Sequence, residues 1–229
     1  PRRLLGLGTL INRYIATLPI VRRACLRNYI VARVLPRNTG RKLSVSVVIP
    51  CRNEKGNIAL AIERLPRLAE NTEILFVEGH SSDGTLEECL RVKDKYVSRD
   101  IKVLTQDGKG KGDAVRKGFE AAQGDVLMIL DADLTVPPEG LPKFLSAIER
   151  EKGEFINGTR LVYPMEKGAM RFLNFLANRF FAVIFSFLLN QRFSDTLCGT
   201  KVLRRSHYMQ IAANRSYFGE FDPFGDFDL

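Results

Sequence analysis

Two aspartates separated by one alanine, Asp131 and Asp133, come directly after the apolar run at residues 126–130. In an extended chain alternate side chains point to the same face, so we expect the two carboxylates to lie side by side. Two negative charges that close repel each other, and a hard divalent cation with oxygen ligands, Mg²⁺ or Mn²⁺, removes the conflict. The pattern predicts half of a metal site; the alternative is a solvated acidic turn before Pro137 and Pro138.

A second candidate for binding anions is the stretch at residues 108–118, which reads GKGKGDAVRKG and opens a predicted helix. Backbone N–H groups of a glycine-rich loop at a helix start bind phosphate, and Lys109 or Lys111 could add positive charge. The stretch is neither a Walker loop nor a GxGxxG turn after a strand. It indicates a diphosphate site only together with other motifs.

The elements that must position these residues alternate between strand and helix from residue 44 onward. Such alternation with short loops indicates an α/β fold, in which a mostly parallel sheet is covered by helices on both faces. Ligands of such sheets bind at the carboxyl ends of the strands, where the polar loops PCRNE, EGHSSDGT, QDGKGKGD and DADLT all fall. The predicted strands are 44–50, 73–78, 101–104, 125–130 and 155–157, and the predicted helices are 57–69, 84–95, 113–123 and 141–152.

The formal net charge of +9 is unevenly distributed, because residues 1–53 hold eleven Lys or Arg and no acidic residue. The main domain lacks this excess of positive charge, which argues against nucleic-acid binding. The basic amphipathic pattern of residues 1–43 suits an anionic membrane surface, and equally the tail of a preceding domain. We therefore divide the chain into a basic helical segment with its linker, 1–43, and a main domain, 44–229, which we interpret as truncated at its C-terminus.

The cysteines and the apolar segments bear on the cellular setting. Four cysteines without CxxC pairing argue against a zinc site and give no disulfide framework, which fits a reduced, cytoplasmic setting. The apolar segment at residues 173–189 contains Asn174, Asn178 and Arg179, so we expect it to lie in an interface or a core rather than across a bilayer. The predicted location is peripheral, at the cytoplasmic face of the membrane.

Taken together and in order, the stretches SVVIPCRNE, SSDGT, GKGDAVRKGFEAAQGD and DADLTVPPE resemble the family 2 glycosyltransferases of GT-A fold, in particular the dolichyl- or polyprenyl-phosphate sugar synthases. The resemblance covers roughly residues 44–205. It implies a Rossmann-like GT-A sheet and transfer of a sugar from a nucleotide diphosphate donor, a GDP- or UDP-sugar, with inversion at the anomeric carbon. A bound Mg²⁺ or Mn²⁺ would stabilise the leaving diphosphate.

The resemblance also implies roles for individual residues. It places Asp131, Asp133 and Thr135 at the metal. The implied donor-binding residues are Pro50, Arg52, Glu54, Val77, Glu78, Asp83, Lys111, Asp131, Ala132 and Asp133, and the implied acceptor-binding residues are Arg160, Arg171 and Asn178.

Two loops depart from the family pattern. Where the family commonly has VDDGSxDGT this chain has VEGHSSDGT, so Glu78 keeps the first acid while Gly79 removes the second, which is expected to read the base. In PCRNE, Arg52 replaces an aromatic residue that could stack on the base. Either Arg52, Glu78 or His80 compensates, or the base is read loosely; a lone loop histidine such as His80 is more often only a loop residue. The nucleotide therefore stays open.

The acceptor decides whether a general base is needed. Arginine suits phosphate through its forked donors, and a phosphate acceptor is already ionised near neutral pH. A sugar hydroxyl would need a base, for which Asp195, Asp226 and Asp228 are candidates; we interpret Asp195 as a cap or surface acid. The predicted catalytic set is Asp133, Arg171 and Asp226.

The sequence thus predicts a metal-dependent, inverting hexosyltransferase that acts on a polyprenyl phosphate at the membrane. One alternative is transfer to a glycan hydroxyl, although the sequence lacks a QxxRW-like processive motif. Another is a non-catalytic nucleotide-sugar binding module, against which the intact DAD motif argues.

Overall fold

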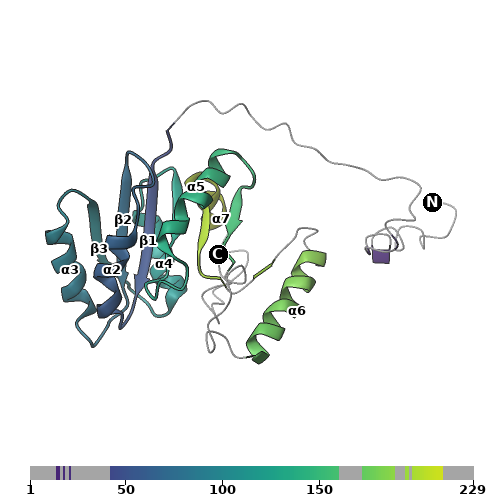
Figure 1. Cartoon of the computed structure of the whole chain (residues 1–229), viewed down its shortest axis with the longest axis horizontal. Helices are drawn as coiled ribbons and strands as arrows, with labels where there is room; N and C mark the ends of the chain where they lie inside the picture. The colour runs from purple at the N-terminus through teal and green to yellow at the C-terminus, as the bar shows by residue number, and fades with distance from the viewer. Residues whose placement is uncertain are drawn as a thin grey trace. The chain divides into compact units, whose positions relative to one another are not determined.

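The computed structural model describes residues 42–159, 172–188, 194–195 and 198–213, together with Tyr14, Ile15, Leu18 and Val21. The chain divides into two compact units, Pro1–Pro36 and Arg37–Leu229. All helices and strands named below belong to the second unit (Figure 1). The domain boundary expected after residue 43 stays a prediction.

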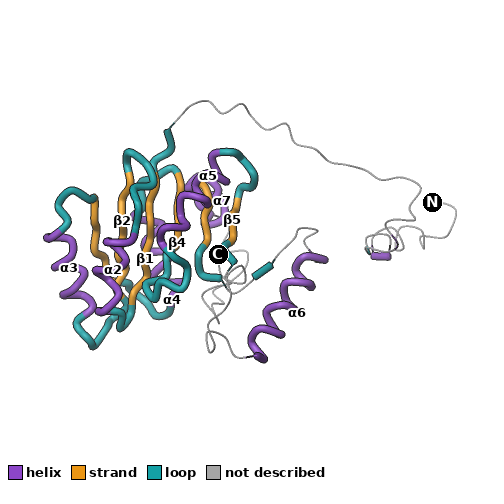
Figure 2. Tube along the Cα trace, in the orientation of Figure 1, coloured by secondary structure: helices purple, strands orange, loops and turns teal. Residues whose placement is uncertain are grey.

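In the described part of the chain, six strands form one mixed sheet (Figure 2). They are β1 Val45–Cys51, β2 Thr72–Glu78, β3 Asp100–Thr105, β4 Val126–Ile129, β5 Phe155–Asn157 and β6 Lys201–Arg204. The order across the sheet is β3-β2-β1-β4-β6-β5. Neighbours from β3 to β4 pair in parallel, whereas β6 runs antiparallel to both β4 and β5. The predicted mostly parallel α/β sheet is confirmed, but β6 was not predicted, because the run KVLR is short and carries a basic residue at each end.

The helices cover both faces of the sheet. Helices α2 Lys55–Arg64, α3 Thr85–Lys95 and α5 Leu141–Glu149 bury apolar residues against one face, and α4 Lys111–Ala121 and α7 Arg205–Ala213 against the other. Because alternate strand residues point to opposite faces, Val47 and Ile49 join the first core while Val48 joins the second. The 3-10 turn η3 Pro138–Gly140 precedes α5, and α6 is Phe172–Leu188.

Helix α2 ends at Arg64, five residues before the predicted end at residue 69. Leu65 is already extended, with φ −73° and ψ 114°. The next residue is Pro66, and a proline pushes the residue before it out of the helical region. The helical spacing of apolar residues, on which the prediction rested, continues past the point where Pro66 ends the helix.

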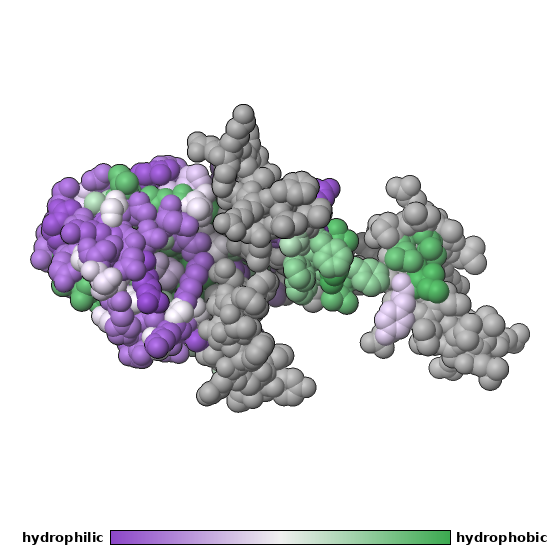
Figure 3. Space-filling view, turned by 90° about the horizontal axis from the view of Figure 1, so that it is seen from below, coloured by the Kyte–Doolittle hydropathy of each residue, from purple (hydrophilic) through white to green (hydrophobic). Residues whose placement is uncertain are grey.

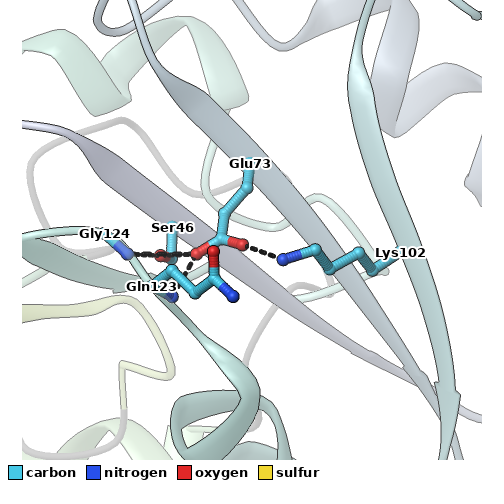
Figure 4. A network of polar contacts seen from close by, with 5 residues as sticks. All are labelled: Ser46, Glu73, Lys102, Gln123 and Gly124. Atoms are coloured by element: carbon cyan, nitrogen blue, oxygen red, sulfur yellow. Dashed lines mark hydrogen bonds and ion pairs between the residues drawn. The ribbon is translucent and has the colours of Figure 1, made fainter.

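A buried carboxylate, Glu73, holds the amino ends of the strands together (Figure 4). It accepts hydrogen bonds from Ser46 on β1, from Lys102 Nζ on β3 at 2.7 Å, and from the N–H groups of Gln123 and of Gly124, the latter at 3.1 Å. Burial opposes ionisation, but these donors outweigh it and hold the pKa of Glu73 below its ordinary value. The folded protein therefore favours the charged carboxylate.

We expect Glu73→Gln to lower the free energy of unfolding at pH 7 by about 2 kcal/mol, because the ion pair is lost and buried donors are left with a weaker acceptor. The folded pKa lies below the unfolded value, so the stabilisation is complete above the unfolded pKa of about 4.3 and is lost as the pH falls through the folded pKa. Urea denaturation at pH 7 and at acidic pH measures both effects; the variant should lose less stability on acidification than the wild type.

The control is Glu70→Gln, which removes the exposed pair between Lys42 and Glu70 at 2.9 Å. It should change the stability by no more than about 0.5 kcal/mol. Equal losses for the two variants would contradict the importance of the buried network.

Candidate active site

A cavity of about 340 Å³ opens at the carboxyl ends of the strands. A larger cavity, of about 510 Å³, lies at the opposite edge and is lined in part by Glu73, Gln123 and Gly124. We assign the site to the smaller cavity because the candidate chemical groups gather there, whereas Glu73 is already engaged by four protein donors. Seven of the predicted donor-binding residues line it: Pro50, Arg52, Glu54, Lys111, Asp131, Ala132 and Asp133.

The two aspartates lie in a turn after β4 rather than on an extension of the strand. The Leu134 N–H donates to the Asp131 carbonyl at 3.1 Å, and Leu134 has a φ of 55°. The Thr135 N–H donates to Asp133 Oδ1 at 3.0 Å. The expectation of an extended DAD is therefore wrong, and a tight turn brings both carboxylates to the cavity instead. The roles of these residues and of Thr135 at a metal stay predictions.

Lys111, the first residue of α4, forms an ion pair with Asp131, with Nζ 2.7 Å from Oδ1. This carboxylate oxygen is buried and, within the described part of the chain, makes no bond of hydrogen-bond geometry in addition to the ion pair. Gly110, immediately before Lys111, has a φ of 89°, a backbone angle that glycine adopts readily. The glycine-rich loop thus delivers an ammonium group directly to the acidic turn.

Gly199, from a distant part of the sequence, lies close to Asp131 and Lys111. A Cβ atom at this position would lie 2.0 Å from Asp131 Oδ2 and 2.3 Å from Lys111 Nζ, so any larger residue would have to displace the ends of these two side chains. Because β6 is antiparallel to β4, its start lies at the same edge as the end of β4. This residue was not predicted from the sequence, since only the glycine itself in DTLCGTK could have indicated a close approach.

We expect Gly199→Ala to lower the free energy of unfolding by about 1 kcal/mol, because the new methyl group must displace the ends of the Asp131 and Lys111 side chains and disturb their ion pair. Gly56 is the matched control, since a Cβ there meets no atom of the described residues within 4 Å. Gly56→Ala in α2 should be neutral or stabilising by about 1 kcal/mol. Urea denaturation of the two variants measures the difference in the free energy of unfolding. Equal stabilities would show that a methyl group fits at Gly199 without displacing its neighbours.

The loops after β1 and β2 are tied to each other. Asn53 Oδ1 accepts a hydrogen bond from the Ser82 N–H at 3.0 Å, and the Asn53 N–H donates to Ser81 Oγ at 2.9 Å. Asn53 and His80 have φ values of 56° and 57°. Non-glycine residues with positive φ are uncommon and persist where their surroundings hold them in place. The cavity wall is therefore fixed by mutual bonding between the two loops.

Three predicted donor-binding residues do not line the cavity. Val77 is fully buried in the core under α4. Burial opposes ionisation of Glu78, but hydrogen bonds from Ser81 outweigh it and hold its pKa below the ordinary value. Asp83 accepts from the Thr85 hydroxyl, which lowers its pKa, and from the Thr85 N–H at 3.0 Å. These side chains support the loops, and their contact with a donor stays a prediction.

On the acceptor side, Asn178 of α6 is fully buried and donates to Asp195 Oδ1 at 2.8 Å. Asn157 at the end of β5 donates to the Asp195 carbonyl at 2.6 Å. Asp195 is 1% exposed, so its interpretation as a surface acid is wrong. Three predicted site residues lie outside the described part of the chain: Arg160, Arg171 and Asp226.

The model of the glycosyl transferase family 2 matches residues 46–212, most of the chain. The chain belongs to this family. A dolichol-phosphate mannosyltransferase from Pyrococcus furiosus is 38% identical over 109 residues, which cover 47% of this chain and 30% of that protein. The Saccharomyces cerevisiae enzyme of the same name is 37% identical over 123 residues, covering 52% and 45%.

An undecaprenyl-phosphate 4-deoxy-4-formamido-L-arabinose transferase from Yersinia enterocolitica is 33% identical over 143 residues, covering 59% of this chain and 43% of that protein. The matched regions thus span less than half the length of these curated relatives. Family membership confirms the resemblance seen in the sequence.

Solved structures confirm the GT-A fold of this family 2 chain. The glucosyl-3-phosphoglycerate synthase of Mycobacterium tuberculosis, in complex with Mn²⁺, uridine-diphosphate-glucose and phosphoglyceric acid, superposes with a TM-score of 0.57 at 19% identity. The match covers 79% of this chain and 63% of that chain. At this identity the likeness establishes the fold alone.

Proposed function

We propose that the chain carries the catalytic domain of a metal-dependent, inverting hexosyltransferase that uses a nucleotide diphosphate sugar and a polyprenyl phosphate. The observation that carries this proposal is the grouping of Asp131, Asp133 and Lys111 at one cavity, with Lys111 Nζ 2.7 Å from Asp131. The cavity volume of about 340 Å³ lies in the range of small-ligand sites. The names of the relatives support polyprenyl phosphates as acceptors.

The residues present fit a divalent cation shared with a diphosphate. Asp131 Oδ1 is buried and forms an ion pair, and among the described residues it has no hydrogen-bond partner; Asp133 lines the same cavity. Within the described ranges, no group of three or more His, Cys, Asp or Glu forms a metal cluster. Mg²⁺ is typically held by one or two carboxylates together with substrate phosphates, which matches two carboxylates at an open cavity. A cation bound here would stabilise the charge on the leaving diphosphate.

Side chains of the protein itself have separate roles in binding the donor. Before a donor binds, the Lys111 ammonium balances the negative charge of Asp131 at 2.7 Å. A bound diphosphate offers this ammonium a second anionic partner at the start of α4, where the helix dipole also favours negative charge. Pro50, Arg52 and Glu54 form the part of the cavity wall proposed to hold the nucleoside. A phosphate acceptor is already ionised, so no proton needs to be removed from it.

We expect Asp133→Ala to abolish the Mn²⁺ dependence of nucleotide binding and to weaken binding of UDP or GDP in Mn²⁺ by about 10- to 100-fold. Isothermal titration calorimetry with and without Mn²⁺ measures this. Asp107→Asn is the control, because Asp107 is an acid in a neighbouring loop whose side chain is 86% exposed. If Asp133→Ala bound nucleotide with undiminished Mn²⁺ dependence, the metal assignment would be wrong.

Helix α6 presents an apolar surface that supports a lipid acceptor. Phe180, Val183 and Phe187 are 62%, 65% and 47% exposed and lie on one side at helical spacing. The polar Asn178 and the small Ala182 are buried instead. Figure 3 colours exposed apolar residues green, in contrast to the mainly purple surface over the sheet. None of the described helices is both long and apolar enough to cross a bilayer. On the basis of the exposed side chains of Phe180, Val183 and Phe187, we propose that this face of α6 contacts the membrane surface from the cytoplasmic side.

We expect the double variant Phe180→Ser and Phe187→Ser to weaken binding to vesicles of equimolar phosphatidylcholine and phosphatidylglycerol by at least about 10-fold, because each buried Phe contributes about 1.5 to 3 kcal/mol. Co-sedimentation over a range of lipid concentrations measures the effect. Ile211→Ser on α7 is the control, since Ile211 is 50% exposed on another helix. Equal losses for both variants would contradict a specific role of α6.

A further inference from the structure

Gly79 replaces the acid that is expected to recognise the base of the nucleotide. The strand register shows which residues lie next to Gly79. Cys51 pairs with Glu78, and Glu78 pairs with Thr105. Two further backbone bonds extend this row: the Gly79 N–H donates to the Cys51 carbonyl at 2.9 Å, and the Gln106 N–H donates to the Glu78 carbonyl at 2.9 Å. Arg52, Gly79 and Gln106, the first residues after the adjacent strands β1, β2 and β3, are therefore neighbours.

The side chain of Gln106 borders the space above Gly79. A Cβ at Gly79 would lie 3.3 Å from Gln106 Oε1 and 3.2 Å from Arg52 Cβ. Gln106 is only 5% exposed, yet it lines the cavity together with Arg52. The position that a longer side chain at residue 79 would occupy is thus flanked by an amide oxygen and by an arginine stem.

The orientation of the Gln106 amide is fixed by its nitrogen. Nε2 donates to the Gly108 carbonyl at 2.9 Å, within the loop that leads to Lys111. A glutamine amide has two donor hydrogens and one acceptor oxygen, and this bond leaves the oxygen directed toward Gly79. The wall of the cavity therefore presents a neutral hydrogen-bond acceptor where the family commonly has an acid.

We propose that Gln106 Oε1 selects the base of the donor by accepting a hydrogen bond from the ring N–H of uracil or guanine, which rests on the proposed function of this cavity as a nucleotide-sugar site. Both bases carry a ring N–H next to a carbonyl, and the guanidinium of Arg52 supplies donors suited to such a carbonyl. Cytosine and adenine present an unprotonated ring nitrogen there, which would face the Gln106 oxygen with no proton between them. Discrimination through a buried polar group of this kind is strong, because the mismatched ligand leaves the group unpaired.

The test measures the affinities of UDP, GDP, CDP, ADP and inorganic diphosphate in Mn²⁺ by calorimetry. The wild type should bind UDP or GDP at least about 10-fold more tightly than CDP and ADP, and Gln106→Leu should reduce this preference to less than about 3-fold. Binding of inorganic diphosphate should stay the same, because it lacks a base. The arms with UDP and GDP show which of the two bases the protein prefers.

Two further variants separate base reading from loop support. Thr105→Val, at the exposed end of β3, should leave the preference unchanged. Gly79→Asp in the Gln106→Leu background returns an acceptor to the same place from the adjacent strand, and it should restore at least part of the preference.

The outcomes that overturn the inference are distinct. Equal weakening of all five ligands in Gln106→Leu would show that Gln106 only supports the loop through Gly108. A wild type that prefers CDP or ADP, or an unchanged preference in Gln106→Leu, would remove the selective role while leaving the proposed function intact. A wild type that binds neither any nucleotide nor diphosphate in Mn²⁺ would overturn the proposed function together with the inference.

Discussion

The parallel pairing of β3, β2, β1 and β4 is the constraint on which the site depends. Parallel strands in register end at the same edge of the sheet, so their pairing alone brings together the loops that follow them. The Glu73 network fixes the amino ends of the same strands and so helps to keep that register. A one-residue slip would turn buried strand residues toward the wrong face and would also separate Arg52, Gly79 and Gln106.

Sequence patterns predicted most of the fold because its central strands are continuous apolar runs, which alternate with helices of clear periodicity. Apolar runs and periodicity did not predict two short or irregular elements. The strand β6 has four residues, and the turn holding Asp131 and Asp133 depends on a positive φ at Leu134, for which apolar periodicity gives no signal. Seven predicted donor residues meet at the cavity because they lie at the carboxyl ends of strands or in the loops and the helix start that follow these ends. Gly199 was missed because its neighbours are set by antiparallel pairing with a distant strand.

Some polar residues of a motif can contact a ligand, whereas others stabilise the loop by hydrogen bonds. Residue type alone does not distinguish the two roles. Glu78 and Asp83 belong to the loop that resembles the family pattern, yet their carboxylates are bound by Ser81 and Thr85. Gln106 carries no motif signature, yet its oxygen stands beside the cavity. Geometry distinguishes these cases, since a carboxylate that accepts several local donors is already occupied, whereas an amide held by its nitrogen keeps its oxygen available.

The contact of Gly199 with Asp131 and Lys111 also orders events during synthesis. The ribosome completes the parallel strands and both acidic residues well before it reaches β6, and domains assemble as the chain emerges. Contacts between residues far apart in the sequence form slowly, because a long loop must close first. A nascent chain could therefore hold a folded sheet with an open acidic turn, and the pocket would take its final shape only when the segment leading into β6 is added.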